Sequence, residues 1–302
     1  MGLGDRKEFP RKPCYIVPRH FLRKFMPELP EVETVRRGLM QISLNQRFTG
    51  AEILLRKTLA HPTDPDHFLG AIRGLIIQDW QRRGKYLLGQ LSDGSTLGVH
   101  LRMTGKFLWT TPDTPLQKHT RMRFFLAGDR ELRFVDLRTF GQIWWVPSDI
   151  PVESVITGLT KLGIEPFSPG FTAEFLAEKC QKRHRPMKTF LLDQSIVTGL
   201  GNIYADEALF KSGIHPTRKA SSLTTAEIKK LHRAIIEVIE TSIAQGGTTF
   251  SDFVSTTGTN GNYGGMALTY GRTGEPCRAC GHPIERIRLG GRSTHFCPQC
   301  QR

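Results

Sequence analysis

Apolar positions that follow Met26 are spaced as on one face of a helix. Val32, Val35 and Leu39 succeed one another at intervals of three and four residues, as in a helix that buries one side. Pro30 suits a first helical turn, and the acidic residues after it favour the positive end of the helix dipole. We therefore expect a helix that begins near Pro30.

Between about residues 47 and 147 the pattern changes to an alternation of apolar and polar positions, with turns at Gly or Pro. Alternation of this kind is typical of half-buried strands. So much of it in one stretch predicts an antiparallel β-sandwich or barrel. The expected strands are 86–91, 96–101, 121–126, 131–136 and 142–146.

Beyond residue 150 the helical spacing returns. A long helix is expected after residue 223, because Thr224 and Glu227 have the spacing of a capping box. Its apolar face continues until Gly246 and Gly247 end the pattern. Shorter helices are expected at 172–181, 187–195 and 202–211, and a loop rich in Gly, Thr and Asn at 256–265.

These patterns predict an α+β protein of several domains. An N-terminal extension (1–26) precedes an antiparallel β-sandwich domain that carries the first helix (27–150). A helical domain (155–250) follows, and a cysteine module (266–302) ends the chain.

The first 25 residues differ from the rest of the chain. They hold seven Lys and Arg against two acidic residues, with three prolines and neither a helical nor a strand period. They lack the apolar stretch of a signal peptide and are poor in the Ser and Ala of a transit peptide. We interpret them either as a disordered basic tail or as the result of a wrongly chosen upstream start codon, in which case translation begins at Met26.

The charge of the chain favours a polyanionic partner. Its formal net charge is +14 and its pI is about 9.8, and without the first 25 residues the charge is still +9. Nucleic acid is the usual partner of such a protein. No apolar run approaches the ~20 residues that span a bilayer, so we expect no membrane partner.

Four of the six cysteines form two C-x-x-C pairs, Cys277 with Cys280 and Cys297 with Cys300. Two such pairs separated by sixteen residues match a tetrahedral zinc site, so we predict one structural Zn²⁺ held by four thiolates. The other two cysteines are isolated, which argues against a secreted disulfide framework and fits a reducing cytoplasm.

Two further segments are suited to nucleic acid. The hairpin between the cysteine pairs carries Arg286, Arg288 and Arg292 around a Gly-Gly turn, and a basic tip of this kind can contact a groove or a phosphate. Gly199–Asn202 joins two expected helices. Such a turn is found in DNA-binding helix-turn-helix motifs and also in ordinary helical hairpins, and the motif alone favours the ordinary hairpin.

The segment after Met26 has a chemical possibility of its own. If translation begins there, removal of the methionine leaves Pro27 with a free secondary amine beside Glu28. An α-amine with a pKa near 8 is roughly 20% neutral at pH 7.4, against ~0.1% for a lysine. Attack of a secondary amine on a sugar C1′ yields an iminium ion, which promotes elimination of the strand phosphates.

Taken together, these elements resemble the formamidopyrimidine-DNA glycosylases, the bacterial 8-oxoguanine glycosylase/lyases. The resemblance extends from Met26 to the C-terminus. It is carried by PELPEVETVRRGL (27–39), QRRGKYLL (81–88), HLRMTGKF (100–107), KH (118–119), DLRTFG (136–141), GLGNIYADEALF (199–210), GIHP (213–216), SIAQGGTT (242–249), YGRTGEPC (270–277) and the cysteine module.

The resemblance implies a base excision repair enzyme that removes oxidised purines from double-stranded DNA and cleaves the strand by β,δ-elimination. Pro27 would be the nucleophile that forms the Schiff base, and Glu28 the general acid that helps to open the sugar ring. Lys85 would donate a proton during β-elimination and contact a phosphate. Arg292 would bind the phosphate that flanks the lesion and assist δ-elimination.

Other residues would contact DNA. Met103, Arg138 and Phe140 would fill the gap left by the flipped base, and the 256–265 loop would cover that base. The helical domain would be a helix-two-turn-helix domain, and the cysteine module would be a zinc finger. The protein would be a monomer in the cytoplasm, associated with the nucleoid. Further contacts would come from His100, His119, Arg183, Lys188 and Asn202.

Three features depart from the family pattern. Thr139 stands where a second arginine is frequent, and Arg121 where a histidine is common. The third is the extension, because an internal Pro27 is a tertiary amide without a basic lone pair. We therefore expect the active enzyme to start at Pro27, through initiation at Met26 or through trimming.

Three other functions can be compared with the sequence. Endonuclease VIII shares the terminal proline and the finger but prefers oxidised pyrimidines, and it typically begins Pro-Glu-Gly-Pro, where this chain reads Pro-Glu-Leu-Pro (27–30). A non-catalytic reader of damaged DNA would result if Pro27 stayed blocked. A zinc-ribbon transcription or structural protein would explain the finger and the charge, but neither Pro27 nor the DLRTFG segment.

Overall fold

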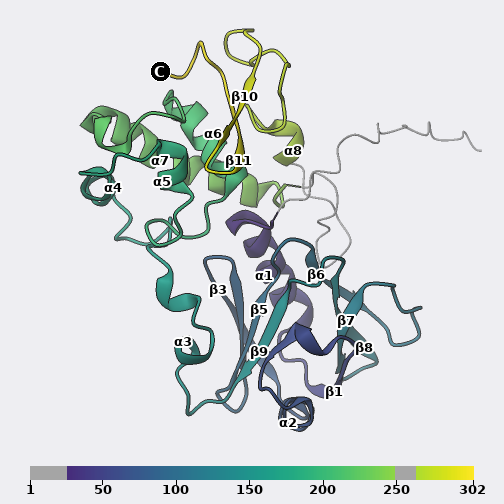
Figure 1. The fold of residues 1–302 in the computed structure, drawn as a ribbon. Coiled ribbons are helices and arrows are strands. Elements are labelled where there is room, and N and C mark those ends of the chain that lie inside the picture. The colour runs from purple at the N-terminus through teal and green to yellow at the C-terminus, as the bar shows by residue number, and fades with distance from the viewer. Residues whose placement is uncertain (1–25, 249–262) are drawn as a thin grey trace, which may run out of the picture.

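The computed structural model describes residues 26–248 and 263–302 (Figure 1). Two predictions fall outside these residues: the disorder of residues 1–25 of the extension, and most of the predicted cover loop (256–262). The predicted fold class is confirmed: a two-sheet domain with an N-terminal helix, a helical domain and a C-terminal cysteine finger. No helix among the described residues is long and apolar enough to cross a bilayer.

Two sheets form the N-terminal domain. The first has the strand order β1-β7-β8-β6 and the second β2-β9-β5-β4-β3, and all pairs are antiparallel except β2 with β9. The bounds are β1 Phe48–Ile53, β2 Leu59–His61, β3 Ile77–Arg83, β4 Tyr86–Leu91, β5 Thr96–His100, β6 Gly105–Thr110, β7 Thr120–Leu126, β8 Arg130–Asp136 and β9 Gln142–Val146.

The five predicted strands correspond to β4, β5, β7, β8 and β9, with ends that agree to within one residue. The prediction missed β1, β2, β3 and β6, and also the short helix α2 (Pro65–Ile72). β3 has the sequence IQDWQRR, in which only Ile77 and Trp80 are buried. A strand with so few apolar positions gives little alternation to detect.

Helix α1 (Leu29–Ser43) joins the two halves of the molecule. Leu29 packs into the core of the helical domain, whereas Val32, Val35 and Leu39 belong to the core between the sheets. In Figure 1 this helix lies between the sheets and the helices above them. Because its first turn sits at this junction, residues 26–31 are held next to both domains.

The helical domain contains α4 (Ala173–Cys180), α5 (Met187–Leu191), α6 (Asn202–Ser212) and α7 (Thr225–Ala244), preceded by the short α3 (Val152–Val155). The predicted capping box of α7 is confirmed, because the Thr224 amide donates to Glu227 and the Glu227 amide donates to Thr224 Oγ1. α5 ends earlier than predicted, since the Asp193 side chain accepts hydrogen bonds from Ser195 and forms a turn.

The C-terminal finger follows α8 (Tyr263–Met266). It contains the hairpin of β10 (Glu285–Leu289) and β11 (Arg292–Phe296). The hairpin packs on α6, because the His295 amide donates to Asp206 Oδ2 at 2.9 Å and Asn202 Nδ2 donates to the Ser293 carbonyl at 2.9 Å. These contacts hold the tip of the finger beside the first turn of α6.

Candidate active site

A cleft of about 740 Å³ opens where the β-sandwich, the start of α6 and the finger hairpin meet. It brings together segments that are more than 250 residues apart in the sequence, because Met26 and Arg292 both line it. Among the residues predicted for the site, those that line the cleft are Glu28, Lys85, His100, Met103, Asn202 and Arg292.

Glu28 lies at the base of this cleft and is only 4% exposed. Its carboxylate accepts hydrogen bonds from the amides of Ile203 (3.0 Å) and Tyr204 (3.4 Å) in the first turn of α6. Helix N-termini present free N–H groups to an anion in this way. Gly201 permits the approach, since a Cβ there would lie 2.3 Å from the Glu28 carboxyl carbon.

The surroundings of Glu28 raise its pKa to about 7. Burial is the largest cause, because desolvation disfavours the charged carboxylate. The Lys85 ammonium acts in the opposite direction, Glu31 raises the pKa further, and the two α6 amides lower it. A carboxyl group with this pKa can donate a proton at neutral pH.

Pro27 precedes Glu28 directly and is buried. The two residues that follow it are fixed by their amides. The Leu29 amide donates to the Gly199 carbonyl of the helical domain at 3.0 Å, and the Glu28 amide donates to Glu31 Oε2 in the first turn of α1 at 2.9 Å. The nitrogen of Pro27 is therefore held by the same contacts that place Glu28.

Glu31 also belongs to the site, although its sequence position predicts only a residue that favours the start of a helix. It is buried, and besides the Glu28 amide it accepts hydrogen bonds from the Thr248 amide (2.8 Å) and the Tyr204 hydroxyl (2.5 Å). Burial raises its pKa. The signal that could have identified it is its spacing, three residues after Glu28, which is that of a helix N-terminal box.

Lys85 reaches the cleft from the turn between β3 and β4. Its Nζ donates to the Leu200 carbonyl at 3.1 Å, across the junction between the two domains. Burial is the main reason that the pKa of Lys85 is lowered, and the charge of Arg292 lowers it further, whereas Glu28 and Glu31 raise it. An ammonium group with a lowered pKa gives up its proton more readily than an exposed lysine.

Lys188 does not line the cleft. Its side chain is fully buried and forms an ion pair with Asp206 at 2.5 Å, and its Nζ also donates to the Asn202 carbonyl at 3.2 Å. It lies beneath Asn202 and the finger hairpin. Its predicted contact with DNA stays a prediction.

Met103, Arg138 and Phe140 lie together at the rim of the cleft, and we call these three residues the wedge. Met103 also lines a second hollow of about 460 Å³ with Phe140. The Arg138 guanidinium contacts Met103 Sδ at 2.6 Å and lies 4.8 Å from the centre of the Phe140 ring. Phe140 is half exposed, so an apolar ring is presented to solvent beside a cation.

Three other residues predicted to contact DNA lie outside the wedge. His100 is buried, accepts a hydrogen bond from the Arg102 amide at Nδ1 (3.0 Å), and has its pKa lowered to about 3, chiefly by burial. His119 lies near the wedge, where its ring contacts Arg121 at 3.2 Å. Arg183 is exposed in the loop after α4 and does not line the cleft.

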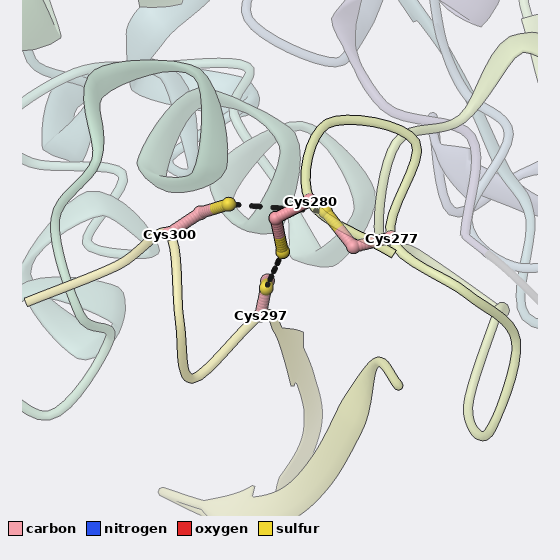
Figure 2. Close-up of side chains that lie close together, drawn as sticks. All are labelled: Cys277, Cys280, Cys297 and Cys300. Carbon is pink, nitrogen blue, oxygen red and sulfur yellow. Dashed lines mark hydrogen bonds between the residues drawn. The ribbon is translucent and has the colours of Figure 1, made fainter. Parts of the chain in front are cut away.

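The four cysteines of the finger gather at one point, and their ligand atoms all lie within 4.8 Å of one another (Figure 2). Cys280 and Cys297 have their sulfur atoms 3.5 Å apart, and Cys277 and Cys300 3.9 Å. Tetrahedral zinc with Zn–S bonds of about 2.3 Å needs sulfur separations of about 3.8 Å. The site fits one structural zinc ion, and four thiolates leave no coordination position for substrate.

Three family models match the chain in the order of its domains. They are the formamidopyrimidine-DNA glycosylase N-terminal domain (residues 26–143), the formamidopyrimidine-DNA glycosylase H2TH domain (162–254) and the zinc finger found in FPG and IleRS (274–302). The first match begins at Met26, where the resemblance in the sequence also begins.

Relatives and solved structures agree with these matches. Formamidopyrimidine-DNA glycosylases from a Synechococcus and a Nostoc species are each 61% identical, over 91% of this chain and 99% and 100% of theirs. The Lactococcus lactis Fpg, solved in complex with DNA that contains an abasic site, is 36% identical, with a TM-score of 0.83 over 91% of this chain and 99% of that one.

A structure of MutM with DNA that contains carbocyclic 8-oxo-G is similar to the same degree, with a TM-score of 0.82 and 36% identity over 91% of this chain and all of that one. Two proteins can share a fold with much lower sequence identity than this chain has to its relatives over nearly their whole length. Together with the three domain matches, this identity shows that the chain belongs to the formamidopyrimidine-DNA glycosylase family.

Proposed function

We propose that this member of the family excises oxidised purines, 8-oxoguanine and formamidopyrimidines, from duplex DNA and then cleaves the strand on both sides of the lost nucleoside. The observation that carries the proposal is Glu28. A buried carboxyl group with a pKa near 7 adjoins Pro27 and faces a cleft with cationic walls. General acids of glycosylase chemistry are tuned in this way.

The chemistry follows from Pro27, which lies between the cleft-lining residues Met26 and Glu28, and from Glu28, Lys85 and Arg292 in the cleft. The neutral amine of Pro27 attacks C1′ of the damaged nucleotide. The base leaves with the electrons of the glycosidic bond and takes up the proton that the Pro27 nitrogen loses. Glu28 protonates the ring oxygen as the C1′–O bond opens, which gives an iminium ion on Pro27. Lys85 takes part in the proton transfers of β-elimination, and Arg292 binds the phosphate that leaves in δ-elimination.

This mechanism requires Pro27 to be the first residue of the active protein. As long as Met26 is attached, the nitrogen is an amide and cannot form the iminium ion. Met26 itself lines the cleft, so its removal also clears space for the sugar. The match of the family model from residue 26 supports a start at this position.

DNA is the partner that the charge and the geometry support. The cleft is lined by Lys85, Arg102, Lys161, Arg286 and Arg292, and such cations bind phosphates with release of counterions. The wedge, with His119, would contact the duplex around the flipped base, and Asn202, Lys188 and Arg183 would contribute on the helical side. We further propose that the protein acts on DNA as a monomer in the cytoplasm, without a membrane partner. Its proposed domains are residues 27–150, 155–250 and 266–302, after the extension 1–26.

The proposal is tested by the products released from a labelled 8-oxoguanine:cytosine duplex. Purified residues 27–302 should release free 8-oxoguanine and leave phosphate groups at both ends of a one-nucleoside gap. A duplex with an oxidised pyrimidine serves as the comparison substrate. Faster release of the pyrimidine would assign the chain the specificity of endonuclease VIII instead, and release of neither base would overturn the proposal.

A further inference from the structure

The wedge is assembled from two segments that are over thirty residues apart, and one buried carboxylate joins them. Met103 lies in the turn before β6, and Arg138 and Phe140 follow the end of β8. Strands β6 and β8 are paired, with Gly105 opposite Asp136. The two segments therefore leave the sheet side by side, and Asp136 is the last residue of β8 at that point.

The Asp136 side chain accepts hydrogen bonds from both segments. Its Oδ1 accepts from the Thr104 hydroxyl and from the Arg138 amide (3.2 Å), and its Oδ2 accepts from the Gly141 amide (2.7 Å). The residue is 1% exposed. These bonds fix Met103 through its neighbour Thr104, and they enclose Arg138 and Phe140 between two anchored amides.

The backbone of Asp136 extends the same arrangement to a third segment. Its amide donates to the His119 carbonyl at 2.9 Å, and its carbonyl accepts from Arg121 Nε at 2.8 Å. Arg121 in turn contacts the His119 ring at 3.2 Å. Three segments predicted to contact DNA thus meet at Asp136, a residue that is not itself predicted to contact DNA.

The loop between the anchors holds a conformation that needs such support. Thr139 has φ +57°, a left-handed conformation that a β-branched residue rarely adopts because it is strained. The turn is also closely packed, since a Cβ at Gly141 would lie 2.5 Å from the Phe134 ring. Strained loops persist where surrounding contacts over-determine them, and the Asp136 hydrogen bonds supply such contacts.

We propose that Asp136 is the positioning residue of the wedge: it holds Met103, Arg138 and Phe140 in one arrangement before DNA arrives, so that insertion into the duplex requires little reordering. This inference rests on the proposed function. It assigns Asp136 no contact with the substrate, and it predicts that loss of the carboxylate impairs base extrusion more than the later chemistry at C1′.

The test uses Asp136→Asn, which keeps the size of the side chain but turns one N–H donor toward groups that themselves donate. Asp129→Asn is the matched control, because Asp129 is exposed in the turn at the other end of β8 and loses the same charge. Thr104→Val, with less risk to folding, removes a hydroxyl that donates to Asp136 Oδ1 and accepts from the Arg138 amide at 2.9 Å. Thr104→Ser restores the hydroxyl.

Two readouts separate positioning from a general structural role. Fluorescence of 2-aminopurine next to the lesion reports unstacking on binding and needs no chemistry, so the full chain can be used. Trapping and excision are measured with residues 27–302, in which the Pro27 amine is free. Borohydride trapping on a duplex with a ready-made abasic site reports the chemistry with the base already gone. We expect Asp136→Asn to lower unstacking and 8-oxoguanine excision about tenfold or more, with trapping on the abasic duplex within about threefold of the parent.

Thr104→Val should show a smaller loss in the same direction, and Thr104→Ser and Asp129→Asn should resemble the parent. Parent-like unstacking and excision in both Asp136→Asn and Thr104→Val would overturn the inference. An equal loss of abasic trapping and excision would also overturn it, because the role would then be general. Failure of the parent itself to trap or excise would instead refute the proposed function.

Discussion

The base of the cleft and the wedge are neighbours, but their side chains differ in exposure to solvent. At the base, Glu28 and Glu31 are buried among amides and hydroxyls, and desolvation raises the pKa of both carboxyl groups. In the wedge, Phe140 is half exposed and Arg138 lies over its ring. Proton transfer needs a group whose pKa is set by exclusion of water, whereas insertion into DNA needs side chains presented to it.

The difference between the two regions also appears in what holds them in place. Glu28 is fixed by the first turn of α6, in another domain. The wedge is fixed from within its own sheet, through the pairing of β6 with β8 and through Asp136. Changes at the base should therefore affect chemistry, and changes in the wedge should affect recognition of the lesion.

The largest effect is expected at the base of the cleft. Glu28→Gln keeps the shape of the side chain but removes the acid, and loss of a general acid typically costs about 10²–10⁴-fold in rate. Single-turnover excision of 8-oxoguanine should fall by this amount, while affinity for a duplex with an abasic-site analogue stays near that of the parent. Glu178→Gln, an exposed residue of α4, is the control. A rate within a few-fold of the parent would remove Glu28 from the mechanism.

Loss of zinc should disable the finger without unfolding the sheets. Cys297→Ser opens the tetrahedral site, and the hairpin that carries Arg292 then loses its support at one end. DNA cleavage should fall at least about tenfold. All four tryptophans lie between residues 80 and 145, so their fluorescence should stay native. A collapse of that signal together with activity would show that the finger stabilises the whole fold.

Truncation of the wedge should have a moderate effect confined to recognition. Phe140→Ala removes the ring that Arg138 covers, and stacking on an aromatic side chain is worth about 1–3 kcal/mol. Excision of 8-oxoguanine should fall about tenfold, with borohydride trapping on an abasic duplex nearly unchanged. Equal losses on both substrates would contradict the separation of the two regions.

The pH dependence of stability provides a test without DNA. In the folded protein the pKa of Glu28 is raised to about 7 from 4.5, so the folded state binds the proton more tightly than the unfolded chain. The resulting stability is complete below pH 4.5 and is lost as the pH rises through 7. Glu28→Gln avoids this loss. Its gain in unfolding free energy over the parent should grow across that window, by up to about 3 kcal/mol, and a constant difference would contradict the buried carboxylate.

The smallest effect concerns the protonation state in which His100 contacts DNA. Its pKa is lowered to about 3, so it is neutral at pH 7 and can act as a hydrogen-bond donor but not as a cation. His100→Ala should weaken binding without changing the salt dependence, whereas Arg292→Ala should reduce the slope of log K against log salt by about one. An equal change of slope in both variants would show that His100 is charged.

Much of this organisation could be predicted from local sequence signals. The two C-x-x-C pairs indicated the zinc site, the Thr224–Glu227 spacing the start of α7, and alternation the regular strands. The roles of Glu31 and Asp136 were not predicted. Both are buried acceptors whose partners lie far away in the sequence, such as Thr248 for Glu31 and Thr104 for Asp136. Periodicity describes which side of an element is buried, but it does not show which distant donors meet a carboxylate there.

The central claim is that the amine of Pro27 is the nucleophile, and borohydride trapping on an 8-oxoguanine:cytosine duplex tests it most directly. Residues 27–302 are compared with the untrimmed 302-residue chain, whose N-terminus is checked by mass spectrometry before and after the reaction. We expect a covalent complex, linked through Pro27, from the shorter form alone. Trapping by the intact longer chain would contradict a proline nucleophile, and trapping by neither form, although both bind the lesion, would make the protein a reader of damage.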